Sequence, residues 1–187
     1  MKRQNSGVLG FVENENIINL IVPNFNMGFI RTKKINGKEY AYLVKNKWYK
    51  RKVKDKGKGP RQRVAKYLGR VYNFDKVNDV DFYNFKKIND LGKYLENNKN
   101  KVFRDLVEWE LFRHNIDNKE FFIDFDNKKI MKSDKEVSLR MNEGFLNSFT
   151  LGRLFGLRSD DSYYLAKCFV EAGIEVPKEV FVGIFGK

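Results

Sequence analysis

Cysteine and histidine are almost absent from this chain of 187 residues: each occurs once, as Cys168 and His114. A single cysteine excludes an internal disulfide, and one cysteine with one histidine is too few for a Cys/His zinc site. P-loop and dinucleotide-binding glycine motifs are missing too, so we expect no cofactor and no bound metal. No apolar run approaches the roughly 20 residues of a membrane-spanning helix, and the start MKRQNSG lacks a secretory apolar stretch. We therefore expect a cytoplasmic protein with no membrane partner.

The chain carries enough apolar residues to bury a core. Hydrophobic residues make up 42% of it and aromatic residues 15%, which is typical of a folded protein. Its length fits one ordinary domain or two small ones.

Positive charge is concentrated in one part of the chain. The net charge is +13. Residues 31–70 hold 16 Lys or Arg against two acids, Glu39 and Asp55, whereas the remaining residues hold 21 basic and 22 acidic side chains. Such a field attracts polyanions. A genome-wide lysine bias is the alternative explanation, but it leaves the neutral remainder unexplained. An acidic membrane would need an amphipathic helix, and this segment has strand signals instead. We expect a nucleic-acid partner and a place at the nucleoid.

Local patterns predict strands in the basic half. FIRTKKI and KEYAYLV flank Asn36-Gly37, a dipeptide favoured in two-residue hairpins. RQRVAKYL, ended by Gly69, predicts a third strand after the basic loop 52–60. Residues 8–30 predict one or two further short strands. We expect a three-stranded antiparallel sheet over roughly 28–72.

After residue 79 the apolar residues recur at helical spacing instead of alternating as in a strand. We expect a helix over 81–97 capped by Asp79 or Asp81, and a second near 98–115 capped by Asn100. A hairpin turning at Asp126-Asn127 and a strand VSLRM should follow. Three more helices are expected from FLNSFTLGRLFGL, SDDSYYLAKCFVEAGI (Ser159 as N-cap, Gly173 as stop) and a last one opened by Pro177.

These elements predict an α+β fold: an antiparallel three-stranded basic sheet followed by a mostly helical domain with a small hairpin. We expect a basic β-rich nucleic-acid-binding domain over 1–75, a helix and linker over 76–100, and a mostly helical domain over 101–187.

The hairpin register sorts the side chains onto two faces. Arg31 should pair with Tyr42, Lys33 with Tyr40 and Ile35 with Lys38. The opposite face then holds Ile30, Thr32, Ala41 and Leu43, which the helix over 81–97 should cover. On the third strand we expect Arg61, Arg63 and Tyr67 on the basic face and Val64 and Leu68 on the aliphatic one. A one-residue slip would exchange the faces and bury the tyrosines, which is the alternative.

The basic face has the chemistry of a nucleic-acid reader. Arg offers a planar donor fork for guanine edges or phosphate, Lys a point charge, and Tyr a flat surface for sugars or bases. Lysines of the loop after the second strand should lie along the backbone. The predicted DNA-binding residues are Arg31, Lys33, Lys38, Tyr40, Tyr42, Lys52, Lys54, Lys56, Lys58, Arg61, Arg63, Lys66 and Tyr67.

This segment resembles the N-terminal stretch of DDE-type insertion-sequence transposases, which open with a basic hairpin, a Tyr-rich strand and an R-x-R…LG element. The matching positions are Phe29, Ile30, Arg31, Lys33, Tyr40, Tyr42, Arg61, Gln62, Arg63, Leu68 and Gly69. In architecture it also resembles the arm-binding domains of tyrosine recombinases, which dock a sheet in the major groove. The resemblance covers about residues 29–70 and implies DNA binding. The chain is too short for the sheet plus a complete catalytic domain.

Two alternatives concern other functions. Asp124 and Asp126 on one strand face would suit a divalent metal and a nuclease- or recombinase-related enzyme, with Glu108, Glu110 or Glu143 as third carboxylate. A hairpin corner is the simpler interpretation of that pair. RNA binding is the other alternative, since the sheet tyrosines would stack on unpaired bases. We expect His114 to be a capping or surface residue and Cys168 a small core residue.

The last helices have helix-turn-helix spacing, but Asp160 and Asp161 at the start of the second helix would repel phosphate. A packed helical hairpin is therefore favoured. The aromatic residues here (Phe149, Phe155, Tyr163, Tyr164, Phe181 and Phe185) exceed what a small unit buries, which predicts a homodimer or another partner. The sequence as a whole predicts a non-enzymatic double-stranded DNA-binding protein of regulatory, architectural or mobile-element function.

Overall fold

The computed structural model describes residues 28–49, 59–156 and 162–185. The fold is α+β. Its strands are β1 (Gly28–Ile35), β2 (Lys38–Tyr49), β3 (Gly59–Asn73), β4 (Phe122–Asp124), β5 (Lys129–Lys132), β6 (Lys135–Met141) and β7 (Gly144–Leu146). Its helices are α2 (Phe82–Lys86), α3 (Leu91–Tyr94), α4 (Lys99–Arg113), α5 (Ser148–Phe155), α6 (Ser162–Ala172) and α7 (Lys178–Phe185). The strands expected before residue 28, the lysines 52–58, and Ser159, Asp160 and Asp161 lie outside the described residues.

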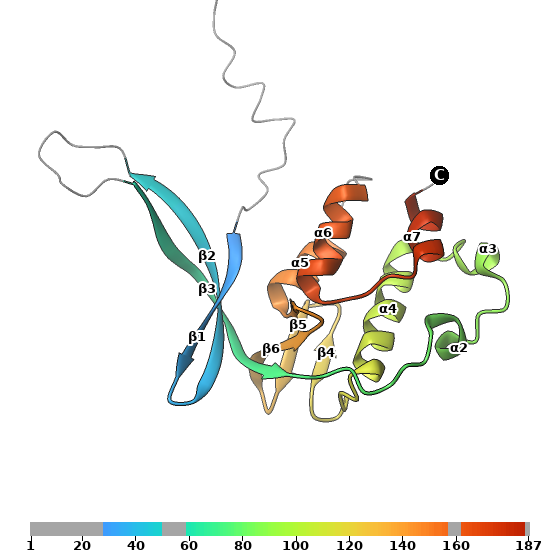
Figure 1. Cartoon of the computed structure of the whole chain (residues 1–187), viewed down its shortest axis with the longest axis horizontal. Helices are drawn as coiled ribbons and strands as arrows, with labels where there is room; N and C mark the ends of the chain where they lie inside the picture. Colours follow the sequence, from blue (N-terminus) through green and yellow to red (C-terminus); the bar gives the residue numbers. More distant parts are fainter. Residues whose placement is uncertain (1–27, 50–58, 157–161, 186–187) are drawn as a thin grey trace, which may run out of the picture.

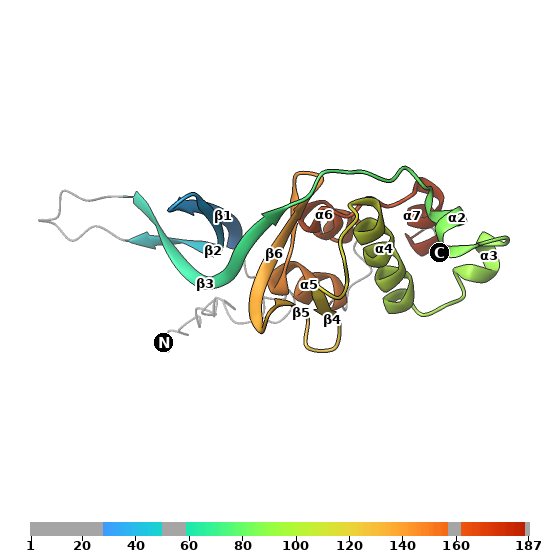
Figure 2. The same cartoon turned by 90° about the horizontal axis from the view of Figure 1, so that it is seen from below.

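The strands form one mixed sheet. Strands β1, β2 and β3 are antiparallel neighbours, β3 runs parallel to β6, and β5 and β4 follow, with β7 also on β6. The antiparallel order of the three strands is as predicted. The expectation that they form a sheet of their own is wrong, because β3 also pairs with β6. We call β1–β3 the ribbon. Figures 1 and 2 show it projecting at one end of the molecule, with the helices gathered at the other.

The hairpin between β1 and β2 follows directly from its turn residues. Asn36 and Gly37 both have positive φ, 48° and 74°, as a two-residue type I′ turn requires. This turn fixes the register, and Ile35 pairs with Lys38, Lys33 with Tyr40 and Arg31 with Tyr42. The predicted pairing is confirmed at all three positions.

We expected β3 to end at Gly69, but the strand continues to Asn73. Gly69 has φ +99°, and a Cβ there would lie 2.3 Å from the carbonyl oxygen of Glu136. The glycine therefore permits a close backbone approach, after which Arg70 to Asn73 pair with Val137 to Arg140 of β6. A feature that in the sequence looks like a strand end is the point where the ribbon joins the rest of the sheet.

The helix expected over 81–97 is two short helices. Asp81 caps α2 as predicted, but Lys87 adopts the left-handed conformation (φ 53°) and ends it, and Asp90 caps α3. The N-cap of α4 is Asn98 and not Asn100. Phe82 is fully buried, with its ring 5.5 Å from that of Trp109 in α4. These helices extend the core beside α4, so the expectation that they cover the ribbon is wrong.

The main core lies between β4–β7 and helices α4–α7 (Figure 1). The apolar face of α4, which includes Phe103, Leu106 and Leu111, is buried there. Cys168 is 1% exposed and is the small core residue expected. Gly173 ends α6 with φ 72°, and Pro177 precedes α7, both as predicted. The hairpin of β4 and β5 turns at Asp126-Asn127, and VSLRM lies in β6, again as predicted.

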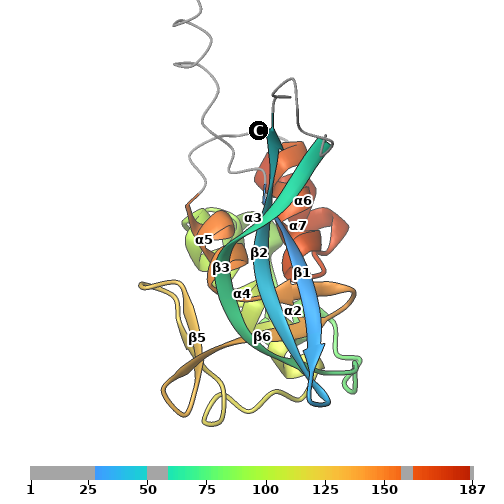
Figure 3. The ribbon, with the colours of Figure 1, turned by 90° about the vertical axis from the view of Figure 1, so that its left-hand side faces the viewer.

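A second, smaller core attaches the ribbon to the rest of the molecule. Ala41, Leu43, Leu68 and Val71 are buried on one side of the ribbon. Phe145 of β7 and Phe149 at the start of α5 pack against them. The aliphatic face thus has a core partner, as expected, but the partner comes from residues 145–149. Figure 3 views the ribbon from its outer side, with the helices behind it.

Candidate nucleic-acid interface

One side of the ribbon gathers basic and aromatic side chains. We call it the tyrosine face: Arg31, Lys33, Lys38, Tyr40, Tyr42 and Tyr67. Cross-strand pairing places these residues together, because Lys33 pairs with Tyr40, and Tyr42 pairs with both Arg31 and Tyr67. Partners across an antiparallel pair point to the same side of the sheet. The opposite side, with Ala41 and Leu43, is the buried one. The structure therefore brings six of the predicted site residues together on the side that no described element covers.

The three tyrosines form one aromatic cluster. The Tyr67 ring centroid lies 5.5 Å from that of Tyr42 and 6.3 Å from that of Tyr40, and Tyr67 is 48% exposed. Burial raises the pKa of Tyr67 above its ordinary value, and the neighbouring Tyr40 and Tyr42 raise it further. Its hydroxyl therefore stays protonated at neutral pH and can donate a hydrogen bond. Such a cluster offers ring faces and O–H donors to a partner.

A groove crosses the tyrosine face toward its outer end. It has a volume of about 480 Å³ and is lined by Arg31, Lys33, Tyr42, Val44, Gln62 and Val64. The Arg31 guanidinium donates a 2.7 Å hydrogen bond to the Gln62 side chain. Phe29 (39%) and Val64 (57%), which both pair with Val44, add exposed apolar surface. Cationic, aromatic and apolar groups thus lie side by side on one accessible surface.

Arg61 and Arg63 do not lie on the tyrosine face. Two bulges interrupt the pairing of β2 with β3, between Ala41 and Tyr42 and between Leu43 and Val44. Each inserts one extra residue into β3, and an inserted residue reverses the side to which the following residues point. Arg63 consequently pairs with Lys45 and Arg61 with Lys47, on the side of Leu43. The prediction that both arginines share the face of Arg31 is wrong, and so is the placement of Val64 on the aliphatic face.

Lys66, another predicted DNA-binding residue, also lies off the tyrosine face. It pairs with Leu43, on the aliphatic side. Its ammonium donates a 3.0 Å hydrogen bond to the Ser148 hydroxyl and lies 3.7 Å from a Glu136 carboxylate oxygen. Its charge is thus partly neutralised at the junction between ribbon and helices, so we remove Lys66 from the interface.

The ribbon is nevertheless strongly basic on both sides. Residues 28–49 and 59–73 contain ten Lys or Arg and one acid, Glu39. Glu39 itself lies 3.7 Å from Arg140 of β6. The predicted loop residues Lys52, Lys54, Lys56 and Lys58 fall outside the described part of the chain.

The alternative metal site has no support in the geometry. Asp124 accepts hydrogen bonds from the backbone N–H groups of Asp126 and Asn127, which hold the hairpin turn and lower the pKa of Asp124. Asp126 pairs with Arg104 at 2.8 Å. Among residues 28–49, 59–156 and 162–185, no three Asp, Glu, His or Cys side chains are grouped to hold a metal ion.

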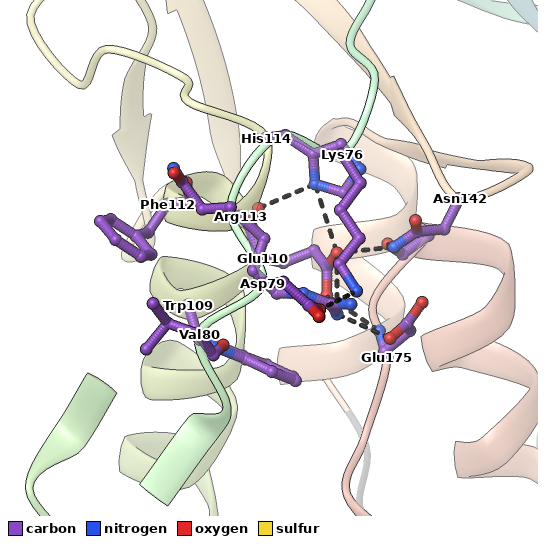
Figure 4. A network of polar contacts seen from close by, with 12 residues as sticks. Lys76, Asp79, Val80, Trp109, Glu110, Phe112, Arg113, His114, Asn142 and Glu175 are labelled. Atoms are coloured by element: carbon purple, nitrogen blue, oxygen red, sulfur yellow. Dashed lines mark hydrogen bonds and ion pairs between the residues drawn. The ribbon is translucent and has the colours of Figure 1, made fainter. Parts of the chain in front are cut away.

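Sequence reasoning missed a buried polar network in the helical part (Figure 4). The Glu110 carboxylate is fully buried and accepts hydrogen bonds from Asn142 (2.6 Å), Arg113 (3.1 Å) and the backbone N–H of Glu175 (3.2 Å). Burial raises the pKa of Glu110, although Arg113 and Asn142 oppose the shift. His114 is a C-cap residue, as expected, but it is buried and not on the surface.

This network has a structural role. It ties α4 to the turn between β6 and β7 and to the connection between α6 and α7, and its hydrogen bonds satisfy the buried carboxylate. The spacing of Glu110 and Arg113, three residues apart on one helix, was the signal that could have revealed it.

In comparisons with known proteins, no family model, no curated protein and no solved structure matches the chain. In the described ranges, no helix combines the length and the apolar character needed to cross a bilayer.

Proposed function

We propose that the chain is a non-enzymatic double-stranded DNA-binding protein that grips a groove with its ribbon, in regulation, DNA architecture or mobile-element control. The observation that carries this proposal is the tyrosine face. It is a sheet surface with Arg31, Lys33 and three tyrosines that no described element covers, on a ribbon with ten basic residues and one acid. Proteins place β-strands as well as helices in the grooves of DNA, and this side-chain set suits both phosphate and base edges.

The proposal is tested by salt-titrated binding of the full chain to duplex DNA, hairpin RNA and single-stranded DNA. We expect the duplex to bind most tightly, without added metal, and affinity to fall steeply with salt. Tyr42→Ala with Tyr67→Ala should weaken duplex binding at least about tenfold, since both rings lie in the middle of the face. Phe122→Ala is the matched control, because Phe122 is 60% exposed on β4, at the opposite edge of the sheet from β1. Equal losses in both variants would contradict the proposal.

RNA binding is the second candidate, and the half-exposed tyrosine cluster favours it. Aromatic side chains on an open sheet stack on unpaired bases, and such stacking contributes about 1–3 kcal/mol per base. Two results together would favour RNA binding over duplex binding. The chain would bind hairpin RNA or single strands more tightly than the duplex, and Tyr67→Phe would lose less affinity than Tyr67→Ala.

An enzymatic role is the third candidate. Asp124 and Asp126 are engaged in the turn and with Arg104, which leaves no prepared metal site between them. Metal-dependent cleavage of the duplex that disappears in Asp124→Asn would contradict the non-enzymatic proposal.

We also keep self-association as part of the proposal. Tyr163 and Val170 on α6 are 80% and 71% exposed and lie seven residues apart, so they share one side of the helix. Three of the six predicted aromatic residues are instead packed, since Phe155 and Tyr164 contact the main core and Phe149 contacts the smaller one. Sedimentation equilibrium of the full chain at increasing concentration decides whether it dimerises.

A further inference from the structure

The groove on the tyrosine face contains an arginine that the fold holds in place. Arg31 starts on β1 opposite Tyr42, and its guanidinium donates a 2.7 Å hydrogen bond to the side-chain oxygen of Gln62 on β3. Gln62 pairs with Asn46, four residues along β2 from Tyr42, so both side chains point to the same side of the sheet. Because β2 lies between β1 and β3 (Figure 3), the Arg31 side chain crosses β2 to reach Gln62.

Apolar side chains lie beside this arginine. Val44 of β2 pairs with Phe29 on one side and with Val64 on the other, and all three point into or beside the groove. Val44 is only 3% exposed although no described element covers this side of the ribbon, so the ribbon's own side chains shield it. Phe29 and Val64 remain 39% and 57% exposed. A fixed guanidinium and projecting apolar groups thus share one small surface.

The guanidinium keeps most of its hydrogen-bonding capacity. The bond to Gln62 uses one of its five N–H donors, and the four that remain include an adjacent pair. Such a pair matches the acceptors O6 and N7 of guanine in the major groove, whereas adenine presents an amino group beside N7 and would set donor against donor. Because Gln62 holds the fork, less side-chain entropy is lost on binding.

The apolar neighbours favour a base edge over a phosphate as the partner of this fork. A phosphate offers nothing to Val64, whereas the 5-methyl group of thymine is the apolar group that the major groove presents. Val64 lies two residues from Gln62, which is about 7 Å along β3, and consecutive nucleotides of one DNA strand lie about 3.4 Å apart along the helix axis. The two contacts therefore fall within about two base-pair steps of each other.

We propose that Arg31, positioned by Gln62, reads a guanine in the DNA major groove, and that Val64 contacts the methyl group of a thymine within two base-pair steps. This inference rests on the proposed duplex binding and adds a sequence preference to it. Other cations of the ribbon then hold the phosphates and carry no sequence information.

The test titrates the full chain with a duplex of repeating d(GGTT)·d(AACC), which contains both spacings, and with three modified forms of it. Replacing guanine by 7-deazaguanine removes N7 and should weaken binding at least about fivefold, the lower limit for one bidentate pair. Replacing adenine by 7-deazaadenine removes the same atom elsewhere in the groove and should change nothing, which makes it the matched control. Replacing thymine by deoxyuridine removes the methyl group and should weaken binding about threefold.

Variants of the chain assign these effects to residues. Arg31→Met keeps much of the side-chain length but no donor, and the loss caused by 7-deazaguanine should disappear. Arg63→Met is the matched control, because Arg63 is exposed on the other side of β3, opposite Lys45. It should weaken binding to all four duplexes by one common factor. Val64→Ala should abolish only the difference between thymine and deoxyuridine.

Gln62 is a positioning residue, so it is tested through the response to 7-deazaguanine. Gln62→Leu removes the acceptor for Arg31 and should reduce that response at least about twofold. Gln62→Glu keeps an acceptor and should retain the response, while its negative charge lowers affinity for every duplex. Equal responses in these two variants would contradict the positioning role. Circular dichroism checks that each variant folds as the parent chain does.

The outcomes separate this inference from the proposed function. Equal affinity for the unmodified duplex and its 7-deazaguanine form would overturn guanine reading and leave duplex binding in place. Disappearance of the guanine effect in Arg63→Met as well would show that Arg31 is not the reader. Equal affinity for the thymine and deoxyuridine forms would overturn the contact of Val64. No binding to any of the four duplexes would contradict the proposed function itself.

Discussion

At the scale of single residues, the junction of the ribbon depends on Gly69. Its φ of +99° is strained for any residue with a Cβ, and that Cβ would meet the backbone of Glu136 and Val137 at 2.3 and 2.6 Å. Because backbone atoms cannot rotate away as a side chain can, substitution must shift β3 against β6.

We predict that Gly69→Ala lowers the free energy of unfolding by at least about 2 kcal/mol, from left-handed strain plus the displacement of β3. Urea unfolding followed by circular dichroism measures this. The control is Gly37→Ala in the hairpin turn, where φ is +74° but nothing lies within 4 Å of the added Cβ. It should cost about 1 kcal/mol, from backbone strain alone. Equal effects of the two substitutions would show that the close approach at Gly69 does not exist.

A second residue-scale prediction concerns acid stability. Burial by itself raises the pKa of Asp105, but hydrogen bonds from Lys86, Tyr94 and Lys101 outweigh it and hold that pKa below its ordinary value. The side chain is 12% exposed, with Lys86 at 2.9 Å. A carboxyl with a lower pKa in the folded state contributes stability above the unfolded pKa of about 4 and loses it as pH falls further.

Asp105→Asn should therefore lower the free energy of unfolding at pH 7 by about 1–3 kcal/mol and flatten its decline between pH 5 and 3. Urea midpoints at a series of pH values measure both effects. Asp75→Asn, at an exposed position, is the control and should leave the pH profile as it is. If the free energy of unfolding falls as steeply between pH 5 and 3 in Asp105→Asn as in the parent chain, another group causes the fall.

At the scale of elements, the inner part of the ribbon has one side that packs on the helical part and one side that no described element covers. Leu68 is fully buried against Phe145 and Phe149, whereas Val64, four residues earlier on the same strand, is 57% exposed. Burial of an aliphatic side chain stabilises the folded state in proportion to the apolar area removed from water.

Leu68→Ala should accordingly destabilise the chain by about 2–4 kcal/mol, and Val64→Ala by less than about 0.5 kcal/mol. Duplex affinity should respond in the opposite order, because Val64 lines the groove beside Arg31. Thermal unfolding and duplex titration on the same two variants measure both orders. A larger stability loss for Val64→Ala would mean that the faces are assigned the wrong way round.

The elements also show which predictions a sequence can support. The β1–β2 register was predictable because Asn36 and Gly37 fix it locally, within two residues. The faces of β3 were not, because the extra residues of its bulges are determined by pairing with β2 and by the approach to β6 at Gly69. Arg61, Arg63 and Val64 were misplaced for this reason, whereas Lys66 lies opposite to Tyr67 by simple alternation along the strand. The core role of Cys168 was predictable from its apolar neighbours in an amphipathic helix, whereas the Glu110 network joins three segments distant in sequence.

At the scale of the whole molecule, the ribbon and the helical part are joined by one continuous sheet and by the smaller core. Four residue pairs join β3 to β6, and the Ser138 hydroxyl donates a 2.7 Å hydrogen bond to the backbone carbonyl of Leu68. Among the described residues outside the ribbon, the core partners of its aliphatic face are Phe145 and Phe149. We predicted a domain boundary at residue 75, near the point where the spacing of apolar residues becomes helical. In the structure, residues on the two sides of that boundary pack against one another.

We predict that fragment 1–75 does not hold the ribbon fold, because Ala41, Leu43, Leu68 and Val71 would face water. Hydrogen exchange of the β2 and β3 amides measures this. Protection factors in the fragment should fall at least about a hundredfold below those in the full chain. Equal protection would show that the ribbon is an independent domain, and binding studies would then need only the fragment.

The central claim is that a polyanion binds the described ribbon through its cations. The most direct measurement is the salt dependence of duplex affinity for the full chain and for a variant with Arg31, Lys33, Lys45 and Arg63 all replaced by Gln. We predict that the slope of log K against log salt falls in magnitude by about 3.6 in the variant, at unchanged circular dichroism. An unchanged slope in a folded variant would contradict the claim.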